Sequence, residues 1–325
     1  EAPLRTAEFG SPRCLPEHSV SARDSEKRGK YQIALNQSVK RHKGPIKKGW
    51  DRVGPQPLNR EEKTMNWIAE KAKKQIIASL AFLLIAIFAS STANGAQSSC
   101  PDQYFQGQSP DFVNERLAQS VKELCNSGYA TMYSGISRTP LWSAEFLTPG
   151  RIEAAKGQPR TEDFRVDLRL PKDFRSTPDD FKRSGKDKGH LAPSADFASP
   201  AAVSESFLMS NMIPQDPNLN RNLWSALESA VRSQAAYQPI YVITGALFIG
   251  SELQRMKGRV LVPTHVYKLL YDPKQNAAAA YLVENAPDKR HREVSLAELE
   301  EIAGVKFLPA AKNVAKLKLP RPRYR

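Results

Sequence analysis

Residues 184–193 read Ser-Gly-Lys-Asp-Lys-Gly-His-Leu-Ala-Pro, and the rest of the chain is best understood from this stretch. His190 directly follows Gly189 inside a short basic segment. Glycine lets a backbone turn tightly or approach a ligand closely, and an imidazole can accept a proton near neutral pH. The stretch is therefore suited to handling an anion. A single histidine in a polar loop is also commonly structural, so further residues must decide.

A second group of distinctive residues follows, reading S-N-M-I-P-Q over 210–215, L-N-R-N-L-W over 219–224 and A-L-E over 226–228. Together with D-K-G-H at 187–190, it resembles the signature of the non-specific DNA/RNA endonucleases with a ββα-metal finger, which include the mitochondrial endonuclease G type. That signature is D-R-G-H, then S-N-x-x-P-Q, L-N-x-x-x-W and L-E. The resemblance runs from about residue 100 to about residue 310. It implies an α+β fold, in which an antiparallel β-sheet core flanked by helices carries a ββα-metal finger active site.

The residue types in these motifs suit phosphodiester hydrolysis. That reaction needs a nucleophilic water, stabilisation of charge on the phosphoryl oxygens and help for the leaving oxygen. A neutral His190 can take the proton from water, and a divalent ion can neutralise the phosphate and the leaving oxygen. We therefore expect His190 to be the general base and Mg²⁺ to be the cofactor, with Mn²⁺ or another divalent ion as the alternative.

Asn220 and Glu228 are the residues expected to hold this ion. The side-chain carbonyl oxygen of Asn220 is a ligand type that suits Mg²⁺, which keeps most of its water molecules. Apolar residues repeat at intervals of three and four from Leu223 onward, which predicts a helix that starts near Asn220. On a regular helix, Glu228 lies about 80° round and about 12 Å along the axis from Asn220, so it is expected to act through bound water. The alternative to metal binding is that Asn220 is an ordinary helix N-cap and that Glu228 is a surface glutamate.

Further residues are expected to assist. The resemblance implies that an arginine about thirty residues before the histidine contacts the scissile phosphate, and Arg160 lies at that distance. Arg165 is the substitute. We expect Asn211 and Gln215 to hold their loop together by hydrogen bonds to the backbone, because neither is placed for proton transfer.

Lys188 stands where the family signature has arginine. Lysine keeps the positive charge but lacks the planar fork that binds phosphate through two hydrogen bonds. We expect Lys188, Lys186 and Arg183 to bind phosphate, and the latter two could compensate for the missing arginine. Asp187 is expected to be structural, because an acid beside a phosphate site would repel the substrate.

The first third of the chain does not read as a folded domain. Residues 1–64 are polar and basic, and the first methionine is Met65. Three lysines, an apolar run from residue 76 to about residue 90 and small residues up to Ala96 then follow in the order of a secretory signal. The run of about 15 residues is shorter than the roughly 20 that span a bilayer. We expect residues 65–96 to be a signal peptide cleaved near Ala96, with an uncleaved anchor as the alternative.

Cleavage would leave residues 97–325 as an endonuclease domain that is periplasmic or secreted and has no stable association with a membrane. Residues 1–64 are then expected to be upstream sequence translated in frame or an artificial extension. The functional alternative is a disordered basic arm that binds nucleic acid.

Charge and cysteine usage agree with an exported protein that meets a polyanion. Residues 97–325 contain 31 Lys plus Arg and 25 Asp plus Glu, a net charge of +6. This moderate excess speeds encounter with nucleic acid without specifying it. Cys100 and Cys125 are the two cysteines of this region, and in an exported chain they suggest one disulfide. The spacing of the cysteines indicates neither a redox pair nor a zinc site.

The remaining segments are expected to form the scaffold. The predicted elements are a helix over 111–126, strands over 129–136, 139–146 and 239–245, a hairpin of 259–271 with 277–283, and a helix over 293–304. The strand at 239–245 is expected to end in a turn at its glycine. The basic tail from about residue 312 is expected to lack fixed structure and could add contacts to phosphate.

These observations predict an exported, Mg²⁺-dependent endonuclease that cleaves DNA and RNA with little sequence preference, since contacts to the phosphate backbone carry no sequence information. Two alternatives stay open. One is a phosphodiesterase for smaller phosphate esters, and the other is a non-catalytic nucleic-acid-binding relative in which Lys188 marks lost activity. The sequence does not reveal the oligomeric state or the preference among single-stranded DNA, double-stranded DNA and RNA.

Overall fold

The computed structural model describes residues 64, 65, 67, 70–75, 97–160, 162–287 and 290–323. The chain divides into two units, Glu1–Leu80 and Ala81–Arg325. In the first unit, the described residues between 64 and 75 are helical. Residues 1–63 and the predicted apolar run and cleavage site at 76–96 lie outside the described residues. Among the helices that are described, none is both long and apolar enough to cross a membrane.

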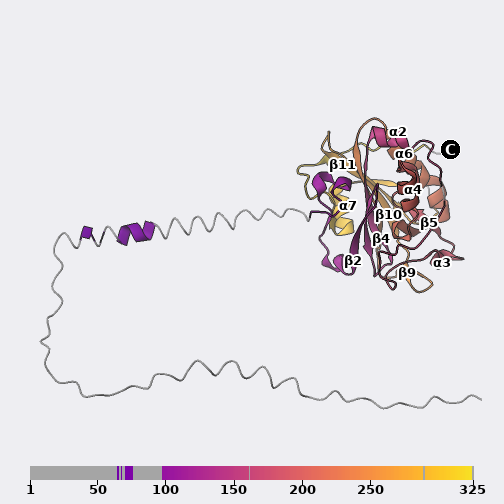
Figure 1. The fold of residues 1–325 in the computed structure, drawn as a ribbon, viewed down its shortest axis with the longest axis horizontal. Coiled ribbons are helices and arrows are strands. Elements are labelled where there is room, and N and C mark those ends of the chain that lie inside the picture. The colour runs from indigo at the N-terminus through magenta and orange to yellow at the C-terminus, as the bar shows by residue number, and fades with distance from the viewer. Residues whose placement is uncertain are drawn as a thin grey trace, which may run out of the picture. The chain divides into compact units, whose positions relative to one another are not determined.

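A β-sheet forms the centre of the second unit (Figure 1). Its strands lie in the order β12-β11-β10-β7-β4-β3-β2, and β14 pairs with β11. The bounds are β2 (Val121–Cys125), β3 (Ala130–Ser134), β4 (Thr139–Leu147), β7 (Ile240–Leu247), β10 (His265–Asp272), β11 (Ala277–Glu284), β12 (Arg292–Ser295) and β14 (Ala315–Lys316). Every pairing is antiparallel except that of β14 with β11. The α+β fold with an antiparallel sheet core is therefore confirmed, as are the predicted strands and the hairpin of β10 with β11.

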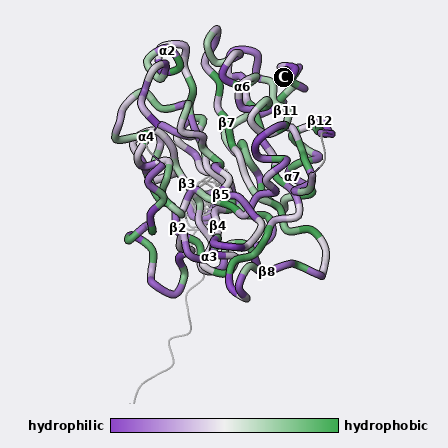
Figure 2. Tube along the Cα trace, turned by 90° about the vertical axis from the view of Figure 1, so that its right-hand side faces the viewer, coloured by the Kyte–Doolittle hydropathy of each residue, from purple (hydrophilic) through white to green (hydrophobic). Residues whose placement is uncertain are grey.

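Helices cover both faces of this sheet, because successive side chains of a strand point to opposite sides. From β7, Val242 packs on one side with Leu227 of α6 (Ser225–Ala235). The next residue, Ile243, packs on the other side with Leu299 of α7 (Leu296–Ala303). Figure 1 shows α6 and α7 on opposite sides of the strands, and Figure 2 shows apolar residues concentrated along central strands such as β7. The core therefore lies in two layers, one on each face.

The segment that contains both sequence motifs forms a two-stranded ribbon followed by a helix. Strand β5 (Asp187–His190) pairs antiparallel with β6 (Met212–Gln215), so that His190 lies opposite Met212. The chain then continues through α5 (Pro217–Leu219), a π-helical turn η6 (Asn220–Trp224) and α6. This is the ββα arrangement that the resemblance implied.

The helix begins earlier than the apolar spacing predicted. Asp216 caps it, since the Asp216 side chain accepts hydrogen bonds from the backbone N–H groups of Asn218 (2.9 Å) and Leu219 (3.2 Å). Asn220 is therefore not an N-cap. Residues 220–224 form a π-helix, which is wider than an α-helix, so the angle of about 80° estimated between Asn220 and Glu228 on a regular helix does not apply.

Shorter elements complete the second unit. The helical ones are η1 (Pro101–Gln103), η2 (Phe105–Gly107), η3 (Glu115–Ala118), α2 (Pro149–Ala155), α3 (Pro178–Phe181), η4 (Ser194–Asp196), α4 (Pro200–Ser206) and η5 (Met209–Asn211). The short strand pairs are β1 (Asp111–Phe112) with β13 (Val305–Lys306) and β8 (Arg255–Met256) with β9 (Val260–Leu261). Helix α7 lies within the predicted range 293–304 but begins only after Ser295, whose side chain caps it by accepting from the Glu298 N–H at 3.2 Å.

The prediction of a helix over residues 111–126 was wrong. The segment holds β1, η3 and the edge strand β2 instead. The Asn114 side chain accepts a hydrogen bond from the Arg116 N–H at 3.2 Å, which closes a short turn. Residues 121–125 then pair with β3. Pairing with a neighbouring strand satisfies the backbone groups that a helix would have bonded internally, so tertiary context overrode the apolar spacing.

Two other expectations about the scaffold also failed. Strand β7 does not end at Gly245 but continues to Leu247. A Cβ on Gly245 would lie 2.4 Å from the Leu141 carbonyl oxygen, so glycine lets the neighbouring strand approach closely. The basic tail is also held in place, because Leu317 and Leu319 are buried in the same core cluster as α6. Alternate leucines in Leu-Lys-Leu give the tail one apolar side to bury.

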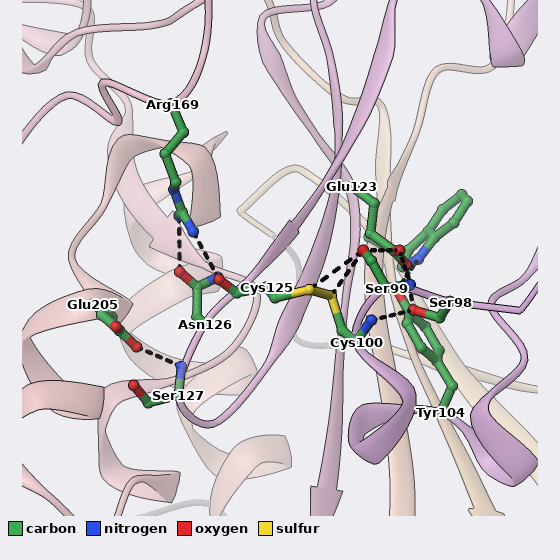
Figure 3. The surroundings of a disulfide bond; sticks show 11 residues. Ser98, Ser99, Cys100, Tyr104, Glu123, Cys125, Asn126, Ser127, Arg169 and Glu205 are labelled. Atoms are coloured by element: carbon green, nitrogen blue, oxygen red, sulfur yellow. Dashed lines mark hydrogen bonds between the residues drawn. A yellow bond between two sulfur atoms is a disulfide. The ribbon is translucent and has the colours of Figure 1, made fainter.

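The predicted disulfide between Cys100 and Cys125 is present, with the two Cα atoms 5.4 Å apart (Figure 3). It joins the segment that precedes the sheet to the end of edge strand β2. The surroundings are polar, and Figure 3 shows Ser99 beside Glu123, with a hydrogen bond of 2.7 Å from the Ser99 hydroxyl to the carboxylate. On the other side, the Arg169 guanidinium donates to the carbonyl oxygen of Cys125 at 2.7 Å. The disulfide therefore ties an edge of the sheet to its neighbours.

Candidate active site

His190 is the last residue of β5 and lies among aromatic side chains. Its ring centroid is 4.9 Å from that of Phe207, in an edge-to-face arrangement, and 5.8 Å from that of Phe164. Within the described part of the chain, Nε2 is enclosed and has no hydrogen-bond partner. Burial lowers the pKa of His190 to about 3, and the positive charge of Arg160 acts in the same direction. The imidazole is therefore neutral at pH 7, which is the form that accepts a proton.

Gly189 leaves room for a buried side chain from the opposite strand. A Cβ at this position would lie 2.1 Å from Oε1 and 2.7 Å from Cβ of Gln215. The strands β5 and β6 therefore close against each other only with glycine here. Gln215 was expected to bond to the backbone, and this was wrong: among the described residues, neither polar atom of its side chain has a hydrogen-bond partner. Gln215 packs over Gly189 instead.

Asn211 fixes the segment that follows His190, as predicted. The Ala192 N–H donates to Asn211 Oδ1 at 3.0 Å, and Asn211 Nδ2 donates to the carbonyl oxygens of Ala192 (2.8 Å) and Ser206 (3.0 Å). The Asn211 side chain is fully buried. Because all these bonds lie away from water, they fix the backbone on the C-terminal side of His190 closely.

A row of polar side chains crosses the sheet next to Asn211, whose hydrogen bonds to Ala192 form a clamp on that residue. Thr131 on β3 and Ser143 on β4 are register partners whose hydroxyls lie 2.9 Å apart, and Ser143 donates to Asn211 Oδ1 at 2.9 Å. On the next two strands, Lys268 Nζ donates to Thr244 Oγ1 at 2.6 Å. All four side chains are buried. The sheet therefore supports the segment that follows His190 through a hydrogen-bonded chain from Thr131 to Asn211.

Asn220 is oriented by Asp187, the first residue of β5. Asn220 Nδ2 donates to Asp187 Oδ2 at 3.0 Å, and the Arg221 guanidinium holds the same carboxylate at 2.9 Å and 2.7 Å. These contacts lower the pKa of Asp187 although its partial burial would raise it. With the amide nitrogen engaged, the Asn220 carbonyl oxygen is left to face a ligand. The prediction that Asp187 is structural agrees with this geometry.

Glu228 lies on α6 two turns beyond Asn220 and is half-buried. Burial raises its pKa, while the positive charges of Lys268 and Arg232 act in the opposite direction. Arg232 follows one helical turn later and pairs with Asp196 at 3.0 Å. Glu228 itself has no ion pair or hydrogen bond within the part of the chain that is described, so its carboxylate is available.

The predicted phosphate-binding residues differ in where they lie. The Arg160 guanidinium carbon is 5.7 Å from the Phe207 ring centroid, and Lys188 Nζ is 4.5 Å from the Phe164 ring centroid, so both border the aromatic setting of His190. Arg165, the substitute for Arg160, donates instead to the Ser204 carbonyl oxygen at 2.8 Å.

Two of the residues expected to bind phosphate, Lys186 and Arg183, do not lie beside the aromatic rings that surround His190. Lys186 Nζ lies 3.9 Å from a carboxylate oxygen of Asp216. Arg183 is exposed in the turn before β5, where its φ of 58° is unusual for a residue with a side chain. Within the described part of the chain, neither side chain forms a hydrogen bond or ion pair with His190, Asn220 or Glu228.

Several residues of the site were missed by reasoning from the sequence. Phe164 and Phe207 surround His190, but isolated phenylalanines carry no pattern that distinguishes them from core residues. Arg232 could have been predicted to lie near Glu228, because it follows four residues later on the expected helix and such residues are neighbours. Lys268 had a sequence signal as well, as a lysine inside the apolar run of β10.

Comparison with known proteins decides the family. The family model described as DNA/RNA non-specific endonuclease matches residues 108–314. The chain belongs to this family. Among the similar relatives of this endonuclease chain is nuclease C1 of Cunninghamella echinulata var. echinulata, 34% identical over 200 residues, which are 55% of this chain and 79% of that protein. Human mitochondrial endonuclease G is 34% identical over 201 residues, covering 56% of this chain and 67% of that protein.

A solved structure agrees with this family. One chain of the crystal structure of the EndoG/EndoGI complex, a study of the mechanism of EndoG inhibition, superposes with a TM-score of 0.53 and 29% identity. The match covers 57% of the endonuclease chain described here and 84% of that chain. The predicted family, fold class and enzyme class are therefore confirmed: the chain is a hydrolase of the nuclease type, and the family typically depends on a divalent metal.

The residues of this endonuclease fit a weakly chelated ion. Within the described ranges, no three His, Cys, Asp or Glu side chains cluster closely enough to enclose a metal. The donors present are the Asn220 carbonyl oxygen, left open by the bond of its amide to Asp187, and the Glu228 carboxylate. A Mg²⁺ ion keeps several water molecules and takes only one or two protein ligands, so this donor set suits it.

Proposed function

We propose that this endonuclease is exported and Mg²⁺-dependent, and that it cleaves DNA and RNA with little sequence preference. One observation supports the proposal most strongly. The paired strands β5 and β6 carry His190 at one end and, at the other, Asp187, which orients Asn220 on the following helix. A proton acceptor and a cation ligand are thus mounted on one small ribbon and its helix.

Each candidate residue has a role in this proposal. His190 takes a proton from the attacking water, Arg160 and Lys188 contact the phosphate, and Arg183 and Lys186 serve phosphates further along the strand. Asn220 holds the ion directly, and Glu228 acts through a bound water. When bound, the ion supplies positive charge that stabilises the phosphoryl and leaving oxygens.

The proton-acceptor role of His190 follows from its surroundings. The aromatic rings of Phe207 and Phe164 exclude water from one side of the imidazole, and Arg160 adds positive charge nearby. Both effects disfavour the imidazolium form. Binding of an anionic substrate brings negative charge close to the ring, which makes the imidazole a stronger base when it is needed.

We further propose that residues 65–96 are a signal peptide and that residues 97–325 act in the periplasm or outside the cell. The disulfide between Cys100 and Cys125 supports an oxidising compartment. The human relative is a mitochondrial protein by name, so the compartment needs its own test. N-terminal sequencing of the protein recovered from the growth medium or the periplasm should begin near Gln97; a chain that still carries residues 65–96 would contradict export by cleavage.

The activity is tested with circular plasmid DNA and with RNA, each in Mg²⁺ and in EDTA. The protein is compared with His190→Ala, and His291→Ala serves as the matched histidine control outside the site. We expect nicking of both substrates in Mg²⁺ by the wild type and the control, and loss of more than a hundredfold in His190→Ala. Equal inertness of all three proteins, with salt-sensitive DNA binding retained, would overturn the catalytic proposal and favour a binding protein.

A further inference from the structure

Two open cavities lie along α6, on the side of the molecule next to the candidate active site. One of about 680 Å³ is lined by residues of α2, by Arg160 and by residues of α6. The other, of about 820 Å³, lies between α6 and the C-terminal tail. Both are lined by Ser229, Ser233 and Tyr237, so they meet over one strip of the helix and form a continuous groove. Figures 1 and 2 both show the C-terminal end of the chain beside α6.

All the charged side chains that line this groove are cations, although Lys156, Arg160 and Arg232 each pair with a carboxylate that lies outside the lining. The cations that line it are Lys156, Arg160, Arg232, Arg321 and Arg323, and among the described lining residues there is no Asp or Glu. A cavity on another part of the surface shows the contrast, because its charged lining residues are three acids, Asp216, Glu252 and Glu284, and one cation, Lys186. The groove therefore complements a polyanion, and the other cavity does not.

The tail presents its arginines from a fixed position. Residues 315 and 316 pair with β11, Leu317 and Leu319 are buried against the core of α6, and the Tyr281 hydroxyl donates to the Pro320 carbonyl oxygen. Arg321 and Arg323 follow directly and are exposed, and no ion pair involves them in the part of the chain that is described. Their guanidinium groups are therefore free to bind phosphate.

Tyr237 stands between the two halves of the groove. It lies in the turn after α6, where its backbone N–H donates to the Gln234 carbonyl oxygen at 3.0 Å, and its side chain is 88% exposed. A large aromatic side chain fixed at its backbone and open to solvent is a platform on which an unpaired base can stack, and such stacking tolerates any base.

The groove also leads to the reacting centre. Arg160 lines its first part and lies beside Phe207, which contacts the His190 ring. We propose that this groove binds the single strand of DNA or RNA that flanks the cleavage site, with phosphates on Arg321 and Arg323 and one base stacked on Tyr237. This inference rests on the proposed nuclease function and adds the path of the substrate to it.

The test measures binding rather than cleavage, so that it is independent of catalysis. Fluorescence anisotropy in EDTA gives the affinity for a 20-nucleotide single strand at several salt concentrations. The variants are Tyr237→Ala, Tyr237→Phe and the double variant Arg321→Ala with Arg323→Ala. The matched control removes two exposed cations that line neither cavity, Arg116→Ala with Lys274→Ala, and thermal unfolding of each variant verifies its fold.

We expect Tyr237→Ala to weaken binding about tenfold and Tyr237→Phe to restore it, since stacking needs the ring and not the hydroxyl. The double arginine variant should lower the slope of log affinity against log salt by about 1.4, or roughly 0.7 for each lost phosphate contact. The control should change the slope by less than half as much. Equal slopes in the arginine variant and the control, or equal losses for Tyr237→Ala on single strands and on blunt duplex, would overturn the proposal. If the groove variants behave as expected while the wild type cleaves nothing in Mg²⁺, the nuclease proposal fails and the groove stands.

Discussion

The side chain of Asn211 holds the backbone of Ala192 from both sides: it accepts from the Ala192 N–H at 3.0 Å and donates to the Ala192 carbonyl oxygen at 2.8 Å. Ala192 is two residues beyond His190, so this clamp sets the direction in which β5 leaves the site. Ser143 supports the clamp from the sheet. His190, the proposed general base, is thus followed by a segment that two fully buried side chains, Asn211 and Ser143, hold in place.

Asn211→Ala should lower the free energy of unfolding by about 3 kcal/mol, because it leaves several buried backbone groups without partners. Ser143→Ala removes the hydrogen bonds of its hydroxyl to Asn211 and to Thr131 but leaves the bonds of Asn211 to Ala192 intact, and it should cost about 1 to 2 kcal/mol. Urea unfolding monitored by circular dichroism measures both. If the two variants lose the same stability, the clamp at Ala192 is not what holds this segment.

Asp187→Asn should weaken binding of the divalent ion by 10- to 100-fold, the usual size of an effect on a group that orients a metal ligand. The variant loses the charged acceptor that fixes the Asn220 amide at 3.0 Å. Arg221→Ala is the matched control, because it removes the ion pair with Asp187 but leaves the bond to Asn220. Titration with Mn²⁺ followed by electron paramagnetic resonance measures affinity directly. A larger loss in Arg221→Ala than in Asp187→Asn would show that charge balance matters more than the orientation of Asn220.

Proton uptake by His190 should occur well below pH 6.5, since burial lowers its pKa to about 3. The neutral, active form therefore predominates above that value, and kcat/KM should fall on the acid side only as the pH approaches it. Arg160→Ala should raise the pKa of His190 because a nearby positive charge is lost, yet the pKa should stay below 6.5 because burial is the larger cause. NMR titration of the imidazole measures this, with Arg116→Ala as the control. If the pKa of His190 is unchanged in Arg160→Ala, Arg160 does not lie close enough to act on His190.

Gly189→Ala should reduce both stability and activity. The added Cβ would lie 2.1 Å from Gln215 Oε1, so strands β5 and β6 must separate or Gln215 must move. Gly150→Ala adds the same group where no atom lies within 4 Å, inside helix α2, and should be neutral or slightly stabilising. Thermal unfolding and plasmid nicking of the two variants make the comparison. Equal behaviour would mean that the finger tolerates a wider spacing of its strands.

The double variant Cys100→Ser with Cys125→Ser should lose about 3 kcal/mol of stability, as expected for a closed loop of 25 residues. The effect arises mainly because the unfolded chain regains freedom. Reduction of the wild type with dithiothreitol should give the same unfolding midpoint as the double variant. Wild-type stability that is insensitive to reduction would contradict the contribution assigned to this disulfide.

The family, the ββα order and the central strands could be predicted from the sequence because each depends on residues close together along the chain. The spacing of His190, Asn220 and Glu228 belongs to one ribbon and its helix, and runs such as Ile240–Leu247 are apolar enough to be recognised as buried strands. The segment 111–126 failed for the opposite reason. Its apolar spacing allowed a helix, and only pairing with β3 decided that residues 121–125 form an edge strand.

By itself the sequence determined which chemical groups this endonuclease has and in what local order: a histidine after a glycine, an amide and a carboxylate on one helix, and a pair of cysteines. Only the tertiary structure decided their surroundings. Phe164, Phe207 and Arg160 come to His190 from segments that are distant in sequence. The burial of the imidazole and the positive charge of Arg160 both lower the pKa of His190, so the ring stays neutral. Burial, and the electric field that accompanies it, are properties of the packed chain, so no local pattern can specify them.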